Sequence, residues 1–128
     1  MAARKFPGTL PSNTVDTAGN AAEALAEKYL NKSGLSTVTR NYRCRLGEID
    51  LIMRDAQHLV FVEVRLRTQQ RFGGAAASIH AHKQRRIVKA AQHYLSNMSS
   101  TPPCRFDVVL LDALDAARIE WIKNAFDA

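Results

Sequence analysis

The stretch that decides the fold reads GEIDLIMRDAQHLVFVEVRLR and spans residues 47–67. Two largely apolar runs, at residues 47–53 and 59–67, carry polar residues at alternate positions around Asp50 and Glu63, which is a pattern of β-strands. The polar segment between them is short enough for a hairpin loop of the four residues 55–58. The stretch therefore predicts two antiparallel strands joined by a tight connection.

This hairpin brings two carboxylates together. With the four-residue loop, Arg54 pairs with Leu59, and the same register places Asp50 opposite Glu63. Opposed side chains across such a pair lie about 4.5–5.5 Å apart at Cβ. Because two like charges at that distance repel, we expect a positive partner between them. A divalent metal is one candidate, and Arg65, on the same strand face as Glu63, is the other.

Alternation assigns the remaining side chains of the hairpin to two faces. The core face is expected to hold Ile49, Leu51, Met53, Val60, Val62, Val64 and Leu66. The opposite face is expected to hold Glu48, Asp50, Ile52, Phe61, Glu63, Arg65 and Arg67. Because two large apolar residues share the charged face, we expect it to be half covered. A charged face that is simply solvated is the alternative.

The rest of the chain supplies two helices and three strands. Apolar residues at helical spacing predict a helix from about residue 18 to Gly34 and a second at about residues 79–98. The predicted strands are residues 35–43, 105–111 and 118–122. The order α-β-β-β-α-β-β indicates an α/β (α+β) fold with a mixed sheet flanked by helices. Residues 1–16 are expected to be a flexible leader and residues 17–128 a single domain.

The charge and hydropathy of the chain indicate which classes of partner it can bind. The 128 residues carry a net charge of +6, and the stretch from Arg40 to Lys89 alone has 11 Lys/Arg against 4 Asp/Glu. Such a basic surface suits a phosphate-rich partner, with simple solubility as the alternative. No apolar run approaches the roughly 18 residues of a membrane span, so no membrane partner is expected. The absence of a signal segment favours the cytoplasm, where Cys44 and Cys104 would be free thiols.

Several motifs together resemble a known family. The two hairpin motifs, GEIDLI at residues 47–52 and VFVEVR at residues 60–65, resemble the PD-(D/E)-x-K nuclease signature. More closely, residues 19–126 resemble the YraN family of small bacterial proteins, which is related to archaeal Holliday-junction resolvases. The supporting pieces are Gly19-x-x-Ala22-Glu23, Arg40-Asn41-Tyr42-Arg43, Phe72-Gly73-Gly74, Lys83-Gln84-x-Arg86-Ile87, Arg105-Phe106-Asp107-Val108-Val109 and Ile119-Glu120-Trp121-Ile122-Lys123.

The resemblance implies a restriction-endonuclease-like nuclease domain that acts on DNA. It implies Asp50 and Glu63 as ligands of a Mg²⁺ or Mn²⁺ ion and Glu23 as a third carboxylate that reaches the site. An exposed helix position is the alternative for Glu23. Relatives of the resolvase type act as dimers, so the resemblance also implies a homodimer.

One residue departs from the nuclease signature, which has Lys where this chain has Arg65. Arginine stays protonated and cannot act as a general base, but it can clamp a phosphate. Arginine also stands here in some YraN members. Lys83, near the start of the second predicted helix, could supply the missing ammonium, with a solvated helix face as the alternative.

The sequence therefore supports two main functions. The first is a metal-dependent endonuclease that hydrolyses structured DNA, with Asp50, Glu63, Glu23 and Arg65 in its site. The second is a non-catalytic nucleic-acid-binding module of the same fold, and a structural protein partner is a third. In each nucleic-acid reading, the phosphate-tracking residues are Arg67, Arg71, Lys83, Arg85, Arg86 and Lys89.

Two residues near the C-terminus are assigned structural roles. Asp107 lies in an apolar strand, and we expect it to face the basic second helix and form a structural salt bridge. Trp121 is expected to pack against the core rather than to stack on bases.

Overall fold

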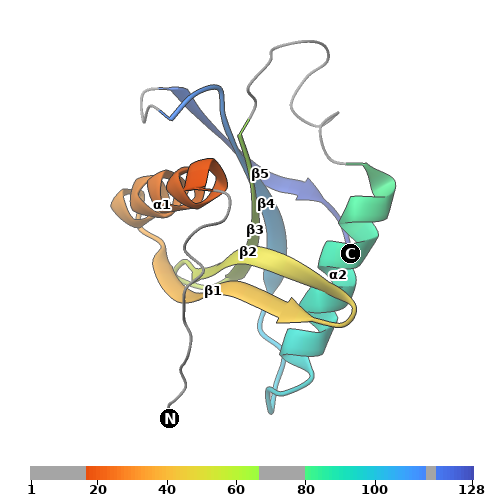
Figure 1. The fold of residues 1–128 in the computed structure, drawn as a ribbon. Coiled ribbons are helices and arrows are strands. Elements are labelled where there is room, and N and C mark those ends of the chain that lie inside the picture. Colours follow the sequence, from red (N-terminus) through yellow and green to blue (C-terminus); the bar gives the residue numbers. More distant parts are fainter. Residues whose placement is uncertain (1–16, 67–79, 115–117) are drawn as a thin grey trace.

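A five-stranded sheet lies between two helices (Figure 1). The computed structural model describes residues 17–66, 80–114 and 118–128. The elements follow the predicted order: α1 (Thr17–Lys32), β1 (Ser36–Cys44), β2 (Gly47–Arg54), β3 (Leu59–Leu66), α2 (Ala81–Leu95), β4 (Cys104–Leu111) and β5 (Ile119–Phe126). Among these residues, no helix is both long and apolar enough to cross a bilayer.

The sheet is mixed, as predicted. Its spatial order is β1-β2-β3-β4-β5, and only the β3–β4 pair is parallel. The β2–β3 register joins Arg54 to Leu59 and continues to Leu51 and Val62, which is the predicted register. Because β3 and β4 run in the same direction, the chain must cross over between them, and α2 lies in this crossover.

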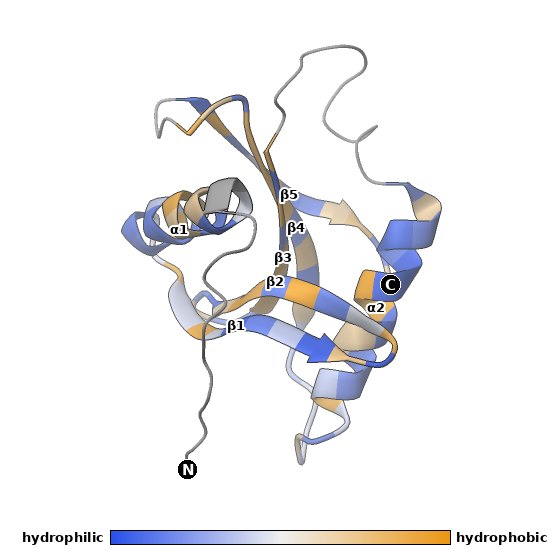
Figure 2. Cartoon of the chain, viewed as in Figure 1, coloured by the Kyte–Doolittle hydropathy of each residue, from blue (hydrophilic) through white to orange (hydrophobic). Residues whose placement is uncertain are grey.

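Each helix covers one face of the sheet. The α1 face buries Ala22, Ala26 and Leu30 of the helix against the sheet residues Leu51, Met53, Val60, Val62, Val109 and Leu111. The α2 face buries Ile87, Ala90 and Ala91 against Ile49, Ile52, Leu59, Phe61 and Phe106. Figure 2 shows hydrophobic colours in the middle strands and hydrophilic colours along much of both helices. The sheet therefore has a core on both faces. Phe61 and Ile52 are buried, as expected for a charged face that is partly covered. Ile49 lies on the α2 side with them, so its expected place on one face with Leu51 and Met53 is wrong.

A change of phase in the two leading strands explains the position of Ile49. Ile49 belongs to the α2-side cluster, whereas Leu51, two residues along, belongs to the α1-side cluster. Across the sheet, β1 pairs Arg40 with Leu51 and Tyr42 with Ile49, and between those pairs Asn41 has a φ of 50°. A left-handed residue inside a strand interrupts the two-residue period of side-chain direction. Strict alternation therefore fails at this point in both strands.

The end of α1 follows a recognised signal. Gly34 has a φ of 105°, and the Leu35 amide donates to the Leu30 carbonyl at 3.0 Å. This is the bond of a Schellman motif, in which glycine adopts the left-handed conformation without steric cost. The prediction that Gly34 ends the helix is confirmed. It matters for the site because it sets where α1 stops and β1 turns back along the sheet.

Candidate active site

An open cavity of about 440 Å³ lies where β2 begins and β3 ends. It is lined by Gly19, Ala22, Glu23, Glu48, Asp50, Glu63, Val64, Arg65, Leu66 and Lys83. These residues come from α1, β2, β3 and α2. The fold thus brings Glu23, Asp50, Glu63 and Arg65, together with Lys83, to one place.

The two strand carboxylates sit where the β2–β3 ladder stops. Leu51–Val62 is the last paired position, and the next position in the same register would join Asp50 to Glu63. Asp50 Oδ2 instead accepts a hydrogen bond from the backbone N–H of Val64 at 2.8 Å. The carboxylate thus takes up a backbone donor of β3, which fixes its direction and lets the strands part beside the cavity.

Glu63 is almost fully buried, with 4% of its surface exposed, and it faces two cations. Its Oε2 lies 3.5 Å from Lys83 Nζ and 3.6 Å from Arg65 Nη1. Burial raises the pKa of Glu63 to about 7, the charge of Asp50 adds to this rise, and the two cations oppose it. The negative charge of Glu63 is therefore only partly compensated by the protein.

Glu23 reaches the same cluster from α1. Burial is the main cause that raises the pKa of Glu23 to about 7, and the charge of Asp50 and a hydrogen bond between the two side chains contribute to this rise. Burial is also the main reason that the pKa of Asp50 is raised, while the Val64 N–H and Lys83 oppose the rise. The three carboxyl groups of the cavity therefore keep their protons to a higher pH than ordinary carboxyl groups do.

Asn41 is a cavity neighbour that the sequence reasoning missed. Its side chain hydrogen-bonds Glu23 and thereby lowers the pKa of that carboxyl group. In the β1–β2 register it stands across from Asp50, in the left-handed conformation. A signal was present in the sequence, because asparagine is depleted in strand interiors but tolerates positive φ better than most residues.

The cluster suits a hard divalent cation. Within the described residues, no three His, Cys, Asp or Glu side chains converge as a complete metal cage. Mg²⁺, however, needs only one or two protein carboxylates, with water and substrate phosphate completing its octahedron. Asp50 and Glu63 supply oxygen donors of this kind. Burial disfavours their charged forms and raises the pKa of both, and a bound cation would oppose this effect. The donor set therefore fits Mg²⁺ or Mn²⁺.

The residues expected to track phosphates divide into three groups. Lys83 lies in the cavity, so its ammonium does not simply point into solvent. Arg85, Arg86 and Lys89 are exposed on α2, outside the carboxylate cluster. Arg67 and Arg71 lie outside the described residues.

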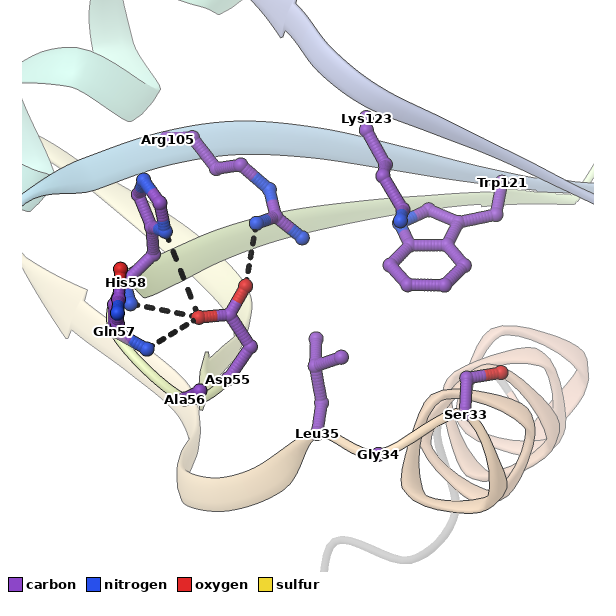
Figure 3. A pocket seen from close by; sticks show the side chains of 10 residues that line it. All are labelled: Ser33, Gly34, Leu35, Asp55, Ala56, Gln57, His58, Arg105, Trp121 and Lys123. Atoms are coloured by element: carbon purple, nitrogen blue, oxygen red, sulfur yellow. Dashed lines mark hydrogen bonds and ion pairs between the residues drawn. The ribbon is translucent and has the colours of Figure 1, made fainter.

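A second cavity, of about 410 Å³, lies near the loop that joins β2 to β3 (Figure 3). There the Asp55 carboxylate accepts from the backbone N–H groups of Gln57 and His58 and from Arg105 Nη1, at 2.9, 2.7 and 2.6 Å. Hydrogen bonding, mainly from the His58 amide, holds the pKa of Asp55 well below its usual range. Arg105 also donates to Asp107, so its guanidinium links the loop to β4.

Asp107 is fully buried in this network. It accepts hydrogen bonds from Arg105 Nε, Trp121 Nε1 and the Asn124 backbone at 3.0, 2.9 and 2.9 Å. The predicted salt bridge is confirmed, but the expected direction is wrong. Phe106 faces α2, so strand alternation turns Asp107 toward the α1 side. Trp121 packs edge-on against Tyr29 at 6.3 Å between ring centroids, which confirms its packing role.

The comparisons with known proteins show the family of the chain. A family model described as "Uncharacterised protein family UPF0102" matches residues 22–111. The chain belongs to the UPF0102 family. The segment that matches the UPF0102 family contains the charged residues that line the first cavity, which are Glu23, Glu48, Asp50, Glu63, Arg65 and Lys83.

Individual UPF0102 proteins are similar over most of their length. A UPF0102 protein of Methylobacillus flagellatus is 56% identical over 86% of this chain and 96% of its own length. Another, of Nitrosospira multiformis, is 56% identical over 89% of this chain and 96% of its own. A third, of Cupriavidus metallidurans, is 56% identical over 91% of this chain and 86% of its own.

Proposed function

We propose that this UPF0102 protein is a metal-dependent endonuclease of the PD-(D/E)-x-K type that acts on structured DNA. The observation that carries the proposal is one cavity in which Asp50 and the buried Glu63 stand beside the cations Lys83 and Arg65. The resemblance to the YraN family and to Holliday-junction resolvases supports the same reading. It also implies a homodimer, which the mass of the protein in solution would test.

Each side chain then has a defined task. Asp50 and Glu63 would hold a Mg²⁺ or Mn²⁺ ion, which when bound lowers the pKa of water and stabilises charge at phosphorus. Arg65 keeps a fixed positive charge that can clamp a phosphate oxygen. Glu23 keeps a proton on the carboxyl cluster and hydrogen-bonds Asp50. These roles need no Ser, His or Cys nucleophile.

Lys83 can replace the lysine of the nuclease signature that this chain lacks at position 65. In that signature the lysine follows the second acidic residue on the same strand, where this chain has Arg65. Lys83 reaches the same carboxylate from α2, with its ammonium 3.5 Å from Glu63. A lysine ammonium can lower its pKa when buried and can orient water. A guanidinium stays protonated and cannot act as a base. We therefore assign to Lys83 the task of the signature lysine.

The deciding experiment is a cleavage assay with labelled duplex, flap and four-way DNA in Mg²⁺ or Mn²⁺. Wild-type protein should cut at least one of these substrates, and Asp50→Asn and Glu63→Gln should not. Glu120→Gln is a matched control, because Glu120 is exposed on β5 and outside the cavity. Equal cleavage by Asp50→Asn and wild type would show that the carboxylate pair is not catalytic.

The second candidate function is a nucleic-acid-binding module of the same fold. The observation that favours it is the arginine at position 65, which cannot act as a base. Such a module would bind DNA with an affinity that falls steeply with salt, and would release no product in any metal. Product from wild-type protein that disappears in Asp50→Asn would exclude it.

A further inference from the structure

The tip of the β1–β2 hairpin carries residues that its turn does not require. Cys44 pairs with Gly47, so the turn consists of Arg45 and Leu46 alone. Two-residue hairpins favour Asn or Gly, because their usual turn types need positive φ. Among the described non-glycine residues, only Asn41 and Asn124 have positive φ, so neither tip residue adopts that conformation. Backbone geometry therefore does not explain an arginine followed by a leucine here.

The tip is held firmly against α2. A Cβ added at Gly47 would lie 2.5 Å from the backbone oxygen of Arg86, so the two backbones are in direct contact. Tyr42 adds an edge-on ring contact with Tyr94, at 5.2 Å between centroids. Figure 1 shows this end of the hairpin beside α2. The backbone of the tip is therefore anchored against α2.

Those side chains combine cations with one exposed apolar group. Leu46 is 44% exposed and is one of three large hydrophobic residues with such exposure in the described part of the chain. Arg43 and Arg45 are exposed on the hairpin, and Arg86 is exposed on the adjoining helix. Arg43 lies 3.3 Å from Glu48, but both are highly exposed, and such surface pairs contribute little free energy. A partner could therefore recruit Arg43 at small cost.

The tip also adjoins the candidate active site. Glu48, which follows Gly47, lines the carboxylate cavity, and so does Lys83, one helical turn before Arg86. A phosphate backbone that reached the cavity would therefore pass close to this basic tip. The arginines of the tip would attract the phosphates, and Leu46 would offer an apolar surface to the face of a base.

From this arrangement we infer that the β1–β2 tip is a second DNA contact, which recognises a branch point or another opened base step. Arg43, Arg45 and Arg86 take backbone phosphates, and Leu46 packs against the exposed face of an unstacked base. The inference rests on the proposed function and deepens it, because it names the class of DNA. Intact duplex hides its base faces, so the leucine contributes only where stacking is interrupted.

The leucine is tested by binding in EDTA, with a four-way DNA and a duplex of the same sequences as probes. Leu46→Ser should weaken binding of the four-way DNA about 3- to 10-fold and leave duplex binding unchanged, since the leucine would bury only part of its apolar surface on a base. Val38→Ser is the matched control, because Val38 is 41% exposed on β1 but lies toward its other end. An unchanged preference for the four-way DNA in Leu46→Ser would overturn the inference.

The arginines are tested by the salt dependence of the same binding. Arg43→Gln combined with Arg45→Gln should reduce the slope of log K against log salt by about 1.8, which corresponds to two phosphates. Arg54→Gln, an exposed arginine at the far end of β2, should leave the slope unchanged. Wild-type protein that bound neither DNA would refute the proposed function. Wild-type binding with an unchanged slope in the double variant would refute only the tip contact.

Discussion

The Lys83 ammonium of α2 lies 3.5 Å from the Glu63 carboxylate of β3. In the sequence, residues 67–79, which lie outside the described residues, come between β3 and α2, and this contact joins the two elements. Glu63 thus faces two cations, Lys83 from α2 and Arg65 from its own strand. If this protein hydrolyses DNA, Lys83 is the ammonium on which turnover depends.

The first prediction concerns Lys83 itself. Lys83→Met should lower the rate of DNA cleavage by about 100-fold or more, the cost of removing one preorganised charge from a site. Arg65→Lys should keep most of the activity, because an ammonium there matches the nuclease signature. Lys28→Met, at an exposed position of α1 outside the cavity, is the control for a general loss of positive charge. Single-turnover cleavage measures all three, and full activity in Lys83→Met would show that the contact is only structural.

The second prediction concerns pH and stability. Glu63 loses its proton near pH 4.5 in the unfolded chain but near pH 7 in the folded protein. Between these values the folded state keeps a proton that the unfolded state has released, so the free energy of unfolding falls as pH rises. The contribution is fully present below about pH 4.5 and is lost above about pH 7.

Glu63→Gln removes this ionisation. The variant should be more stable than wild type above pH 7 by about 1–3 kcal/mol, and the difference should vanish below pH 4.5. Urea denaturation at a series of pH values measures it, with Glu120→Gln as the control. Added Mg²⁺ should then stabilise wild type and leave Glu63→Gln nearly unchanged, since a ligand stabilises the state that binds it. A pH-independent difference would contradict this account.

The third prediction separates the backbone of Asn41 from its side chain. Asn41→Ala should lower the free energy of unfolding by about 1–2 kcal/mol, because alanine is strained at positive φ. Asn41→Gly should keep the fold but lose the hydrogen bond to Glu23, so its defect should appear in cleavage rate.

Asn124 provides the control for this pair of variants. It is the other described non-glycine residue with positive φ, at 53°, and it lies on β5. Asn124→Ala should cost similar stability and leave cleavage by the folded fraction unchanged. If Asn41→Gly matches wild type in both stability and rate, the asparagine amide has no part in the site.

The fourth prediction concerns the contact between β2 and α2. Gly47→Ala must move the helix, since the new Cβ would lie 2.5 Å from the Arg86 carbonyl. We expect a loss of about 1–3 kcal/mol in the free energy of unfolding, the usual cost of overpacking, together with reduced cleavage as Lys83 shifts. Gly34→Ala is the control, because it is strained by its φ of 105° but meets no neighbouring atom. It should lose stability and keep the cleavage rate.

The sequence alone determined the elements and the central register. Periodicity placed both helices and all five strands in order, and the polar loop of residues 55–58 set the β2–β3 pairing. The last strand was the least complete, because Lys123 and Asn124 interrupt its apolar pattern although β5 continues to Phe126. Local pattern is informative wherever one residue's environment follows from its near neighbours.

Tertiary structure decided which face each side chain takes and which distant groups meet. The left-handed backbone at Asn41 changes the phase of β1, and Ile49 and Leu51 of β2 turn to opposite helices. The docking of α2 places Lys83 against Glu63, and the docking of α1 brings Glu23 to Asp50. Sequence spacing could nominate these residues, but their meeting depends on helix positions set by core packing, which no local pattern encodes.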